Sequence, residues 1–279
     1  MPELPEIQAH AERLTDEFGG AVLAKFTPIT FTALKTVVPR PDEAVGAALE
    51  SVGRRGKFLL MRFPGDLTFV VHLMQGGRLI PDEKQSAKPR FGIARWTFSD
   101  GRALLLTEAG KERKAGVWVM AGDPLTQDPL AKLGVDADVV SRDGLAALLA
   151  VTKGRLHGFL RDQHGVAGLG RMLANEICHR ARLSPFATCS KLSADEVGRL
   201  YDALQSCIAD ALAFERSLDA MSKSADRPGA VHRRKGADCP VCGDTIRAVE
   251  YNAYEVDYCP TCQTGGKVLA DNTTSKFLK

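Results

Sequence analysis

The sequence has no long apolar run and no strong excess of charge of one sign. No stretch approaches the roughly 18 apolar residues of a membrane-spanning helix, and no internal repeat or low-complexity tract is present. Glu3 and Glu6 stand where a secretory signal would need a basic segment and then an apolar one. These absences argue against a membrane protein, a repeat array and a secreted precursor, and they predict a cytoplasmic protein.

What is present is ordinary globular composition. With 279 residues, 44% of them hydrophobic and 25% charged, the chain is long enough for one large or two modest domains with a real core. A formal net charge of +3 favours a polyanionic partner only weakly. The positions of particular residues therefore carry more information than the totals.

The seven cysteines are unevenly spread. Four lie in two CxxC pairs near the C-terminus, whereas Cys178, Cys189 and Cys207 are scattered. A disulfide framework would need a small secreted protein, so this pattern predicts a reducing compartment and one metal site.

Short apolar segments bounded by turn residues dominate the first part of the chain. They are KFLLMRF (57–63), LTFVVHLM (67–74), ARWTFS (94–99) and RALLLTE (102–108), and each predicts a strand. Turn residues separate them, as in Ser-Asp-Gly at 99–101. The pattern predicts an N-terminal β-sandwich domain over residues 1–125, with the opening segment as a helix packed on it.

The period becomes helical after a turn-rich stretch at 121–134. Ser141 is placed to cap a helix through DGLAALLAV, and Ser193 with Glu196 forms a capping box before a later helix. A polar loop at 221–229 precedes the cysteine module. We therefore predict an α+β fold, with a helical domain over 136–220 and a metal-binding module with a C-terminal tail over 231–279.

The cysteine pairs form a C-x2-C-x16-C-x2-C motif of Cys239, Cys242, Cys259 and Cys262. Zinc is held tetrahedrally by thiolates, and two CxxC knuckles at this spacing supply four sulfurs from the ends of a β-hairpin. We expect one structural Zn²⁺ here. The metal alone implies no catalysis, and the neighbouring basic run at 233–235 is either a nucleic-acid contact or a solvated surface.

Two further motifs have both an ordinary and a chemical explanation. In DQHGVAGLGRMLANEICHRARLSP (162–185), the amides of Gly168, Gly170 and Arg171 would open a helix and suit a phosphate, unless this is only a tight helix–helix turn. The opening PELPE suits a helix start. If Met1 is removed, however, Pro2 becomes a secondary amine and a nucleophile.

Together these motifs resemble the bacterial formamidopyrimidine-DNA glycosylase and endonuclease VIII family. The resemblance extends over the whole chain in order, through PELPE, RRGK (54–57), HLMQGGRL (72–79), AGLG…NEI…ARLSP, VHRRKGADCPVCG and YCPTCQ. It implies a helix-two-turn-helix DNA-binding domain and a zinc-finger hairpin, in a monomer that binds double-stranded DNA with damaged bases or abasic sites.

The resemblance also implies roles for residues near the N-terminus. Pro2 is expected to attack C1′ of the damaged nucleotide through a Schiff base, with Glu3 as the acid/base and Glu6 as a secondary candidate. Lys57 corresponds to a strand-end lysine that contacts phosphate. The damaged nucleotide must be flipped out of the stack, and a side chain must fill the gap.

Several positions depart from the family pattern and suggest a divergent bacterial member. Arg171 replaces the usual Asn after the GxG turn, Tyr254 replaces an Arg near the hairpin tip, and His157 aligns with a Lys. In the wedge loops, Gln75 takes the place of the intercalating Met, with Met74 beside it. Arg113 matches the Arg that reads the orphan base, and Ala115 replaces the Phe plug.

The sequence thus predicts a DNA glycosylase with AP-lyase activity that excises oxidised or ring-opened bases and cleaves the strand by β,δ-elimination. An alternative is a damaged-DNA-binding protein on the same scaffold with weak or no catalysis, since Tyr254 and Ala115 are unlike the family. A third, a zinc-ribbon regulator, would leave PELPE unexplained.

Overall fold

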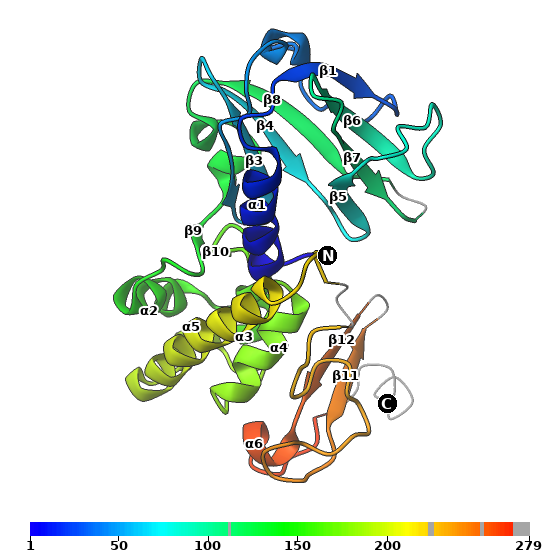
Figure 1. The fold of residues 1–279 in the computed structure, drawn as a ribbon. Coiled ribbons are helices and arrows are strands. Elements are labelled where there is room, and N and C mark those ends of the chain that lie inside the picture. The colour runs from blue at the N-terminus through cyan, green and yellow to red at the C-terminus, as the bar shows by residue number, and fades with distance from the viewer. Residues whose placement is uncertain (111–112, 223–225, 252–253, 270–279) are drawn as a thin grey trace. The chain divides into compact units, whose positions relative to one another are not determined.

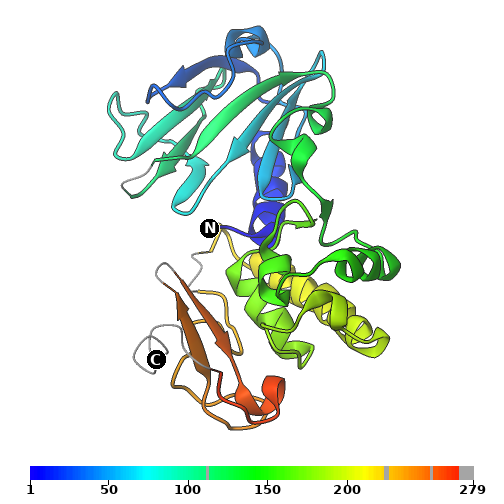
Figure 2. The same cartoon turned by 180° about the vertical axis from the view of Figure 1, so that it is seen from behind.

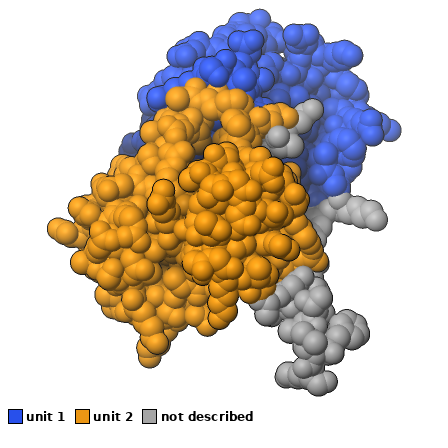
Figure 3. All heavy atoms as spheres, turned by 90° about the horizontal axis from the view of Figure 1, so that it is seen from below, with its two compact units in different colours: residues 1–132, 215–224 blue, residues 133–214, 225–279 orange. Residues whose placement is uncertain are grey.

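The computed structural model describes residues 1–110, 113–222, 226–251 and 254–269, and the chain forms two compact units (Figure 3). Unit 1 contains residues 1–132 and 215–224, and unit 2 contains residues 133–214 and 225–279. The predicted C-terminal tail beyond 269 lies outside the described residues. None of the described helices is long and apolar enough to cross a membrane.

Unit 1 is a β-sandwich with one long helix (Figures 1 and 2). Each sheet has four antiparallel strands. One sheet has the order β1 (Leu23–Pro28), β6 (Gly92–Phe98), β7 (Ala103–Glu108) and β5 (Gly77–Pro81), and the other β2 (Ser51–Arg55), β3 (Phe58–Phe63), β4 (Leu67–His72) and β8 (Gly116–Ala121). The four strands predicted from the sequence correspond to β3, β4, β6 and β7, so the sandwich prediction is confirmed.

Helix α1 (Leu4–Phe18) packs along β2 and β3. Its buried positions Ile7, Ala11, Leu14 and Phe18 recur at helical spacing and join the sandwich core. The core centres on Trp96, whose ring meets Phe26 edge-on at 5.0 Å. This packing fixes the start of α1, and with it the PELPE segment.

Unit 2 combines helices with a zinc-finger hairpin. Its elements are β9 (Val135–Asp136), α2 (Arg142–Val151), α3 (Leu156–Arg161), β10 (Val166–Ala167), α4 (Arg171–Arg180), α5 (Ala194–Arg216, whose last two residues belong to unit 1), β11 (Arg247–Tyr251), β12 (Tyr254–Tyr258) and α6 (Pro260–Thr264). Short 3-10 turns η1 (Pro41–Ala44), η2 (Pro124–Thr126), η3 (Leu130–Lys132) and η4 (Cys189–Lys191) complete the fold.

Both predicted helix caps are present. The Ser141 hydroxyl accepts the Gly144 N–H at 3.0 Å, and α2 starts at the next residue. Before α5, the Ser193 N–H donates to the Glu196 carboxylate at 2.8 Å while the Ser193 hydroxyl accepts the Glu196 N–H at 3.3 Å. Local sequence therefore determines where these helices begin.

The boundaries of the two compact units differ from those of the three predicted domains. The domain boundaries remain a prediction. The end of α5 and the segment after it belong to unit 1. The Arg13 guanidinium donates to the carbonyl oxygens of Glu215 and Leu218 at 3.0 and 3.3 Å, and Arg216 forms a bidentate pair with Glu12. Polar contacts between residues about 200 positions apart in the sequence thus hold the end of α5 and the segment after it in unit 1.

Candidate functional site

The PELPE segment presents two buried carboxyl groups at the start of α1. Pro2 is buried, and the Glu3 and Glu6 residues are 5% and 4% exposed. The Glu3 N–H donates to Glu6 Oε2 at 3.0 Å, which fixes the first turn.

The sequence predicted Lys57 as the first residue of a strand. In the structure it lies in the turn between β2 and β3, one residue before β3 begins, and only 8% of it is exposed. His72, at the end of β4, lies near it, and the His72 ring packs on Phe58 at 4.4 Å. Burial, and secondly the Lys57 charge, lower the pKa of His72 to about 4. His72 is therefore neutral near pH 7, and its Nδ1 accepts the Met74 N–H at 3.2 Å.

The predicted wedge residues occupy two loops of unit 1. Gln75 is exposed, whereas Met74 has a left-handed backbone (φ 54°) and is packed partly against the core. Arg113 is exposed, with its guanidinium 6.0 Å from the Phe91 ring centre. Ala115 is fully buried, and its N–H donates to Glu108 at 2.6 Å. An aromatic side chain thus lies beside Arg113, but it comes from position 91.

In unit 2, the glycine-rich turn leads into α4. Gly168 adopts a left-handed φ of +102° and donates its N–H to Gln163 at 3.0 Å. Gly170 is the N-cap residue, and Arg171 is the first residue of α4. A pocket of about 350 Å³ opens here, lined by Arg171, His232, Arg233, Glu250, Tyr251, Tyr254 and Glu255. The first residue of α4, the segment of His232 and Arg233, and the hairpin therefore line one pocket.

A buried polar network holds the pocket residues His232 and Arg233 in place. The fully buried Asp257 carboxyl accepts the Arg233 N–H at 2.9 Å and the Asn175 amide at 3.0 Å. The same Asn175 nitrogen lies 2.9 Å from His232 Nδ1, which is 3.4 Å from Asp257. Sequence reasoning missed Asn175, His232 and Asp257, because nothing in the chain marks them as partners.

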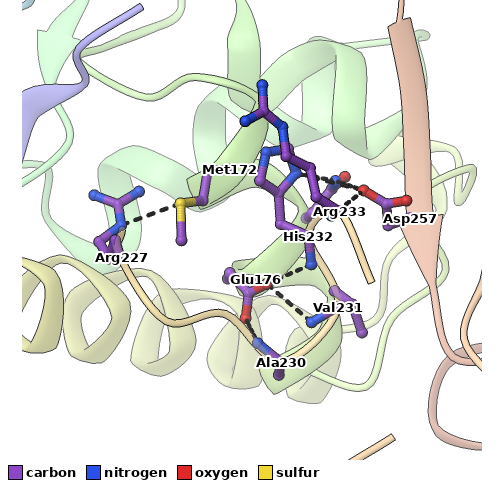
Figure 4. A network of polar contacts seen from close by, with 9 residues as sticks. Met172, Glu176, Arg227, Ala230, Val231, His232, Arg233 and Asp257 are labelled. Carbon is purple, nitrogen blue, oxygen red and sulfur yellow. Dashed lines mark hydrogen bonds and ion pairs between the residues drawn. The ribbon is translucent and has the colours of Figure 1, made fainter. Parts of the chain in front are cut away.

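Glu176 fastens the chain segment that carries His232 and Arg233 (Figure 4). Its carboxylate accepts three successive backbone N–H groups, from Ala230 at 2.7 Å, Val231 at 3.0 Å and His232 at 2.8 Å. The Glu176 side chain of α4 thus fixes the backbone of residues 230–232, just before the zinc finger.

Tyr254 contacts two other side chains through its ring. Its ring lies 4.8 Å from the Tyr251 ring at an interplanar angle of 13°, and the Arg161 guanidinium carbon lies 4.5 Å from its centre. His157, on the same helix as Arg161, is buried, and burial with the Arg161 charge lowers its pKa to about 3. His157 is therefore uncharged at neutral pH, unlike the lysine with which it aligns.

The metal centre gathers all four predicted cysteines. The sulfur atoms of Cys239 and Cys262 are 3.9 Å apart, and those of Cys242 and Cys259 are 3.4 Å apart, close to the spacing of thiolates around one zinc ion. A backbone N–H at Asp244 lowers the pKa of the Cys242 thiol, whereas burial raises the pKa of the Cys259 and Cys262 thiols. The residues fit one structural zinc, as predicted.

His179 lies at the same centre and was missed from the sequence. It is 5% exposed, and its Nε2 is 3.3 Å from the Cys239 sulfur and within 4.8 Å of those of Cys259 and Cys262. Because His179 belongs to α4, it ties the helix to the zinc finger. Gln263 adds a second tie, through the carbonyl oxygen of Leu183 at 3.0 Å.

Comparisons with known proteins agree with this architecture. Residues 1–117 match the formamidopyrimidine-DNA glycosylase N-terminal domain, residues 125–222 its H2TH domain, and residues 238–265 the zinc finger found in FPG and IleRS. The chain is similar to an uncharacterized formamidopyrimidine-DNA glycosylase-like protein of Mycobacterium tuberculosis, at 48% identity over 164 residues that cover 57% of this chain and all of that protein.

Two relatives are similar over nearly the whole chain. The formamidopyrimidine-DNA glycosylase of a Roseiflexus species is 32% identical, with 94% of this chain and 100% of that protein covered. The crystal structure of the MutM (Fpg) protein of Thermus thermophilus is 27% identical, with 96% and 100% covered and a TM-score of 0.81. The chain therefore belongs to the formamidopyrimidine-DNA glycosylase and endonuclease VIII family, whose members are DNA glycosylases of base excision repair.

Proposed function

We propose that this protein is a bifunctional DNA glycosylase and AP lyase that acts on double-stranded DNA with oxidised or ring-opened bases or abasic sites. The observation that carries the proposal is the buried Pro2-Glu3 pair at the start of α1, with the Glu6 carboxyl 3.0 Å from the Glu3 amide. A solved relative of the same fold, the Lactococcus lactis enzyme at 19% identity and a TM-score of 0.84, is bound to DNA containing an AP site.

The proposed chemistry begins when removal of Met1 frees the Pro2 amine. An α-amine has an ordinary pKa of about 7.7 to 8.0, so a substantial fraction is neutral and nucleophilic near pH 7. Its nitrogen attacks C1′, and the base leaves with the electron pair of the glycosidic bond while Glu3 supplies a proton. The product is an aminal in which C1′ is bonded to the Pro2 nitrogen and to O4′. Loss of the amine proton, with cleavage of the C1′–O4′ bond and protonation of O4′, then opens the sugar and gives an iminium ion between Pro2 and C1′.

The iminium withdraws electrons and makes the C2′ proton acidic. Loss of that proton with departure of the 3′-phosphate is β-elimination, and subsequent departure of the 5′-phosphate is δ-elimination. Lys57 is proposed to hold a phosphate. In unit 2, Gly168, Gly170, Arg171 and Tyr254 are proposed to contact the DNA backbone, and Met74, Gln75 and Arg113 to contact the base stack. We further propose that the protein acts as a monomer on nucleoid DNA in the bacterial cytoplasm.

Borohydride trapping tests the nucleophile. With an abasic-site duplex, the wild-type protein should form a covalent adduct, and Pro2→Gly or a variant that retains Met1 should form far less. Glu3→Gln should slow base excision by about 10² to 10⁴-fold with little change in DNA affinity, because general acid–base catalysis contributes about that much. Glu12→Gln is a matched control on the same helix, since Glu12 pairs with Arg216. Equal trapping by the Met-retaining variant would falsify the assignment of Pro2.

The second candidate function is damage binding without efficient catalysis. Tyr254 in place of an arginine and the buried Ala115 in place of a phenylalanine favour it. Tight binding to an abasic-site duplex with neither trapping nor excision would establish this alternative and reject the enzyme.

A further inference from the structure

The Tyr254 ring contacts two other side chains. Tyr251 lies nearly parallel to it at 4.8 Å and occupies one face. The Arg161 guanidinium carbon also lies over the Tyr254 ring, 4.5 Å from its centre. Such a cation–π contact restrains a side chain that would otherwise be free to rotate. The stack therefore holds the guanidinium of α3 beside the hairpin strand β12.

The stacked guanidinium retains its hydrogen-bonding capacity. Within residues 1–110, 113–222, 226–251 and 254–269, the Arg161 guanidinium donates no hydrogen bond to the protein, and the same holds for the guanidinium groups of Arg171 and Arg233. Arg171 and Arg233 line the pocket, and Tyr254, on which Arg161 stacks, lines it too. Planar guanidinium groups match phosphate oxygens in bidentate geometry.

The remaining charges around the pocket do not cancel this arrangement. Glu250 forms an ion pair with Lys235, which leaves Glu255 as the other carboxylate of the lining. The N-terminus of the ten-residue helix α4 adds partial positive charge beside Arg171. The cross-strand pairing of Tyr251 with Tyr254 explains why two aromatic rings are stacked on the hairpin. It does not explain why an arginine with unused donors lies against the Tyr254 ring.

We propose that Arg161 is a further DNA-binding residue, held by Tyr254 so that it binds a backbone phosphate next to the one bound by Arg171. Arg161 of α3 thus supplies the positive charge that is missing from the hairpin, where Tyr254 takes the place of an arginine. This inference rests on the proposed function, since it assumes that the pocket faces DNA. It assigns a role to Tyr254 that is independent of charge.

The test measures the salt dependence of binding to a duplex that carries a tetrahydrofuran abasic-site analogue, by fluorescence anisotropy on the full-length zinc-loaded protein. Losing one phosphate contact reduces the slope of log affinity against log salt by about 1. Arg161→Gln should show this reduction. Its affinity deficit relative to wild type should then shrink about fourfold between about 50 and 200 mM salt. Arg199→Gln, on α5 and paired with Asp195, is the matched control and should keep the wild-type slope.

A rescue variant separates charge from folding. Arg161→Gln combined with Tyr254→Arg returns a guanidinium to the hairpin and should restore most of the slope and affinity. Zinc content and thermal unfolding of each variant show whether the fold is intact. An unchanged slope in Arg161→Gln overturns the inference. So does a loss of affinity that is the same at every salt concentration, because it indicates a structural role. If wild type binds no damaged duplex and forms no trapped adduct, the proposed function itself fails.

Discussion

The anchoring of the 230–232 segment by Glu176 leads to a quantitative prediction. Three backbone N–H groups donate to this one half-buried carboxylate, at 2.7 to 3.0 Å. A hydrogen bond to a charged group contributes about 1.5–3 kcal/mol, and bonds that share one acceptor group are not additive. Because water reaches the half-buried site and replaces part of the loss, Glu176→Ala should lower the free energy of unfolding of unit 2 by about 2–4 kcal/mol.

Glu176→Gln is the matched variant. It retains the oxygen that accepts from Val231 and His232 and loses the charge and the bond to Ala230. We expect a loss of about 1–2 kcal/mol. Urea unfolding followed by circular dichroism gives both values, and hydrogen exchange of the amides at 230–232 locates them. The reasoning is refuted if these amides stay as protected in Glu176→Ala as in wild type, or if the two variants are equally stable.

Two other predictions concern histidines. Burial lowers the pKa of His10 to about 4 in the folded protein, below its ordinary 6.5. The unfolded chain therefore binds the proton first, and lowering the pH from 6.5 to 5 should destabilise unit 1 by about 1–2 kcal/mol. His10→Gln, which keeps a donor for the Leu79 carbonyl, should reduce the slope of that part of the pH profile in urea unfolding, with the contribution of His72 remaining, and an unchanged profile would contradict the assignment. At the zinc centre, His179→Phe should weaken zinc retention against a chelator by about 10- to 100-fold, because His179 contacts the zinc ligand Cys239. The control His164→Phe, at an exposed position, should have no effect. Equal zinc retention by His179→Phe and wild type would exclude a role for His179.

The features that the sequence predicted correctly are local. Ser141 and Ser193 mark helix starts through bonds to residues three positions away, and the cysteine spacing defines the zinc centre because each knuckle is a short segment. Lys57, predicted as the first residue of a strand, lies in the turn one residue before β3, since the tight connection between β2 and β3 includes it.

The features that could not be predicted depend on contacts across long sequence separations. Asn175 and Asp257 are 82 residues apart, and neither has a neighbour that indicates the other. The same holds for Arg161 and Tyr254, whose contact depends on how the hairpin packs beside α3. A single sequence contains no record of such pairs, so polar networks of this kind are seen only in the folded structure.

The discontinuity of unit 1 has a consequence for synthesis on the ribosome. Residues 215–224 belong to this unit and are bound to it through Arg13 and Glu12, yet they are translated after nearly all the helices of unit 2. The N-terminal sandwich therefore receives its last segment only when some 80 residues of the other unit have already emerged. Until then, the nascent chain exposes the Arg13 face of α1 to water and to other proteins.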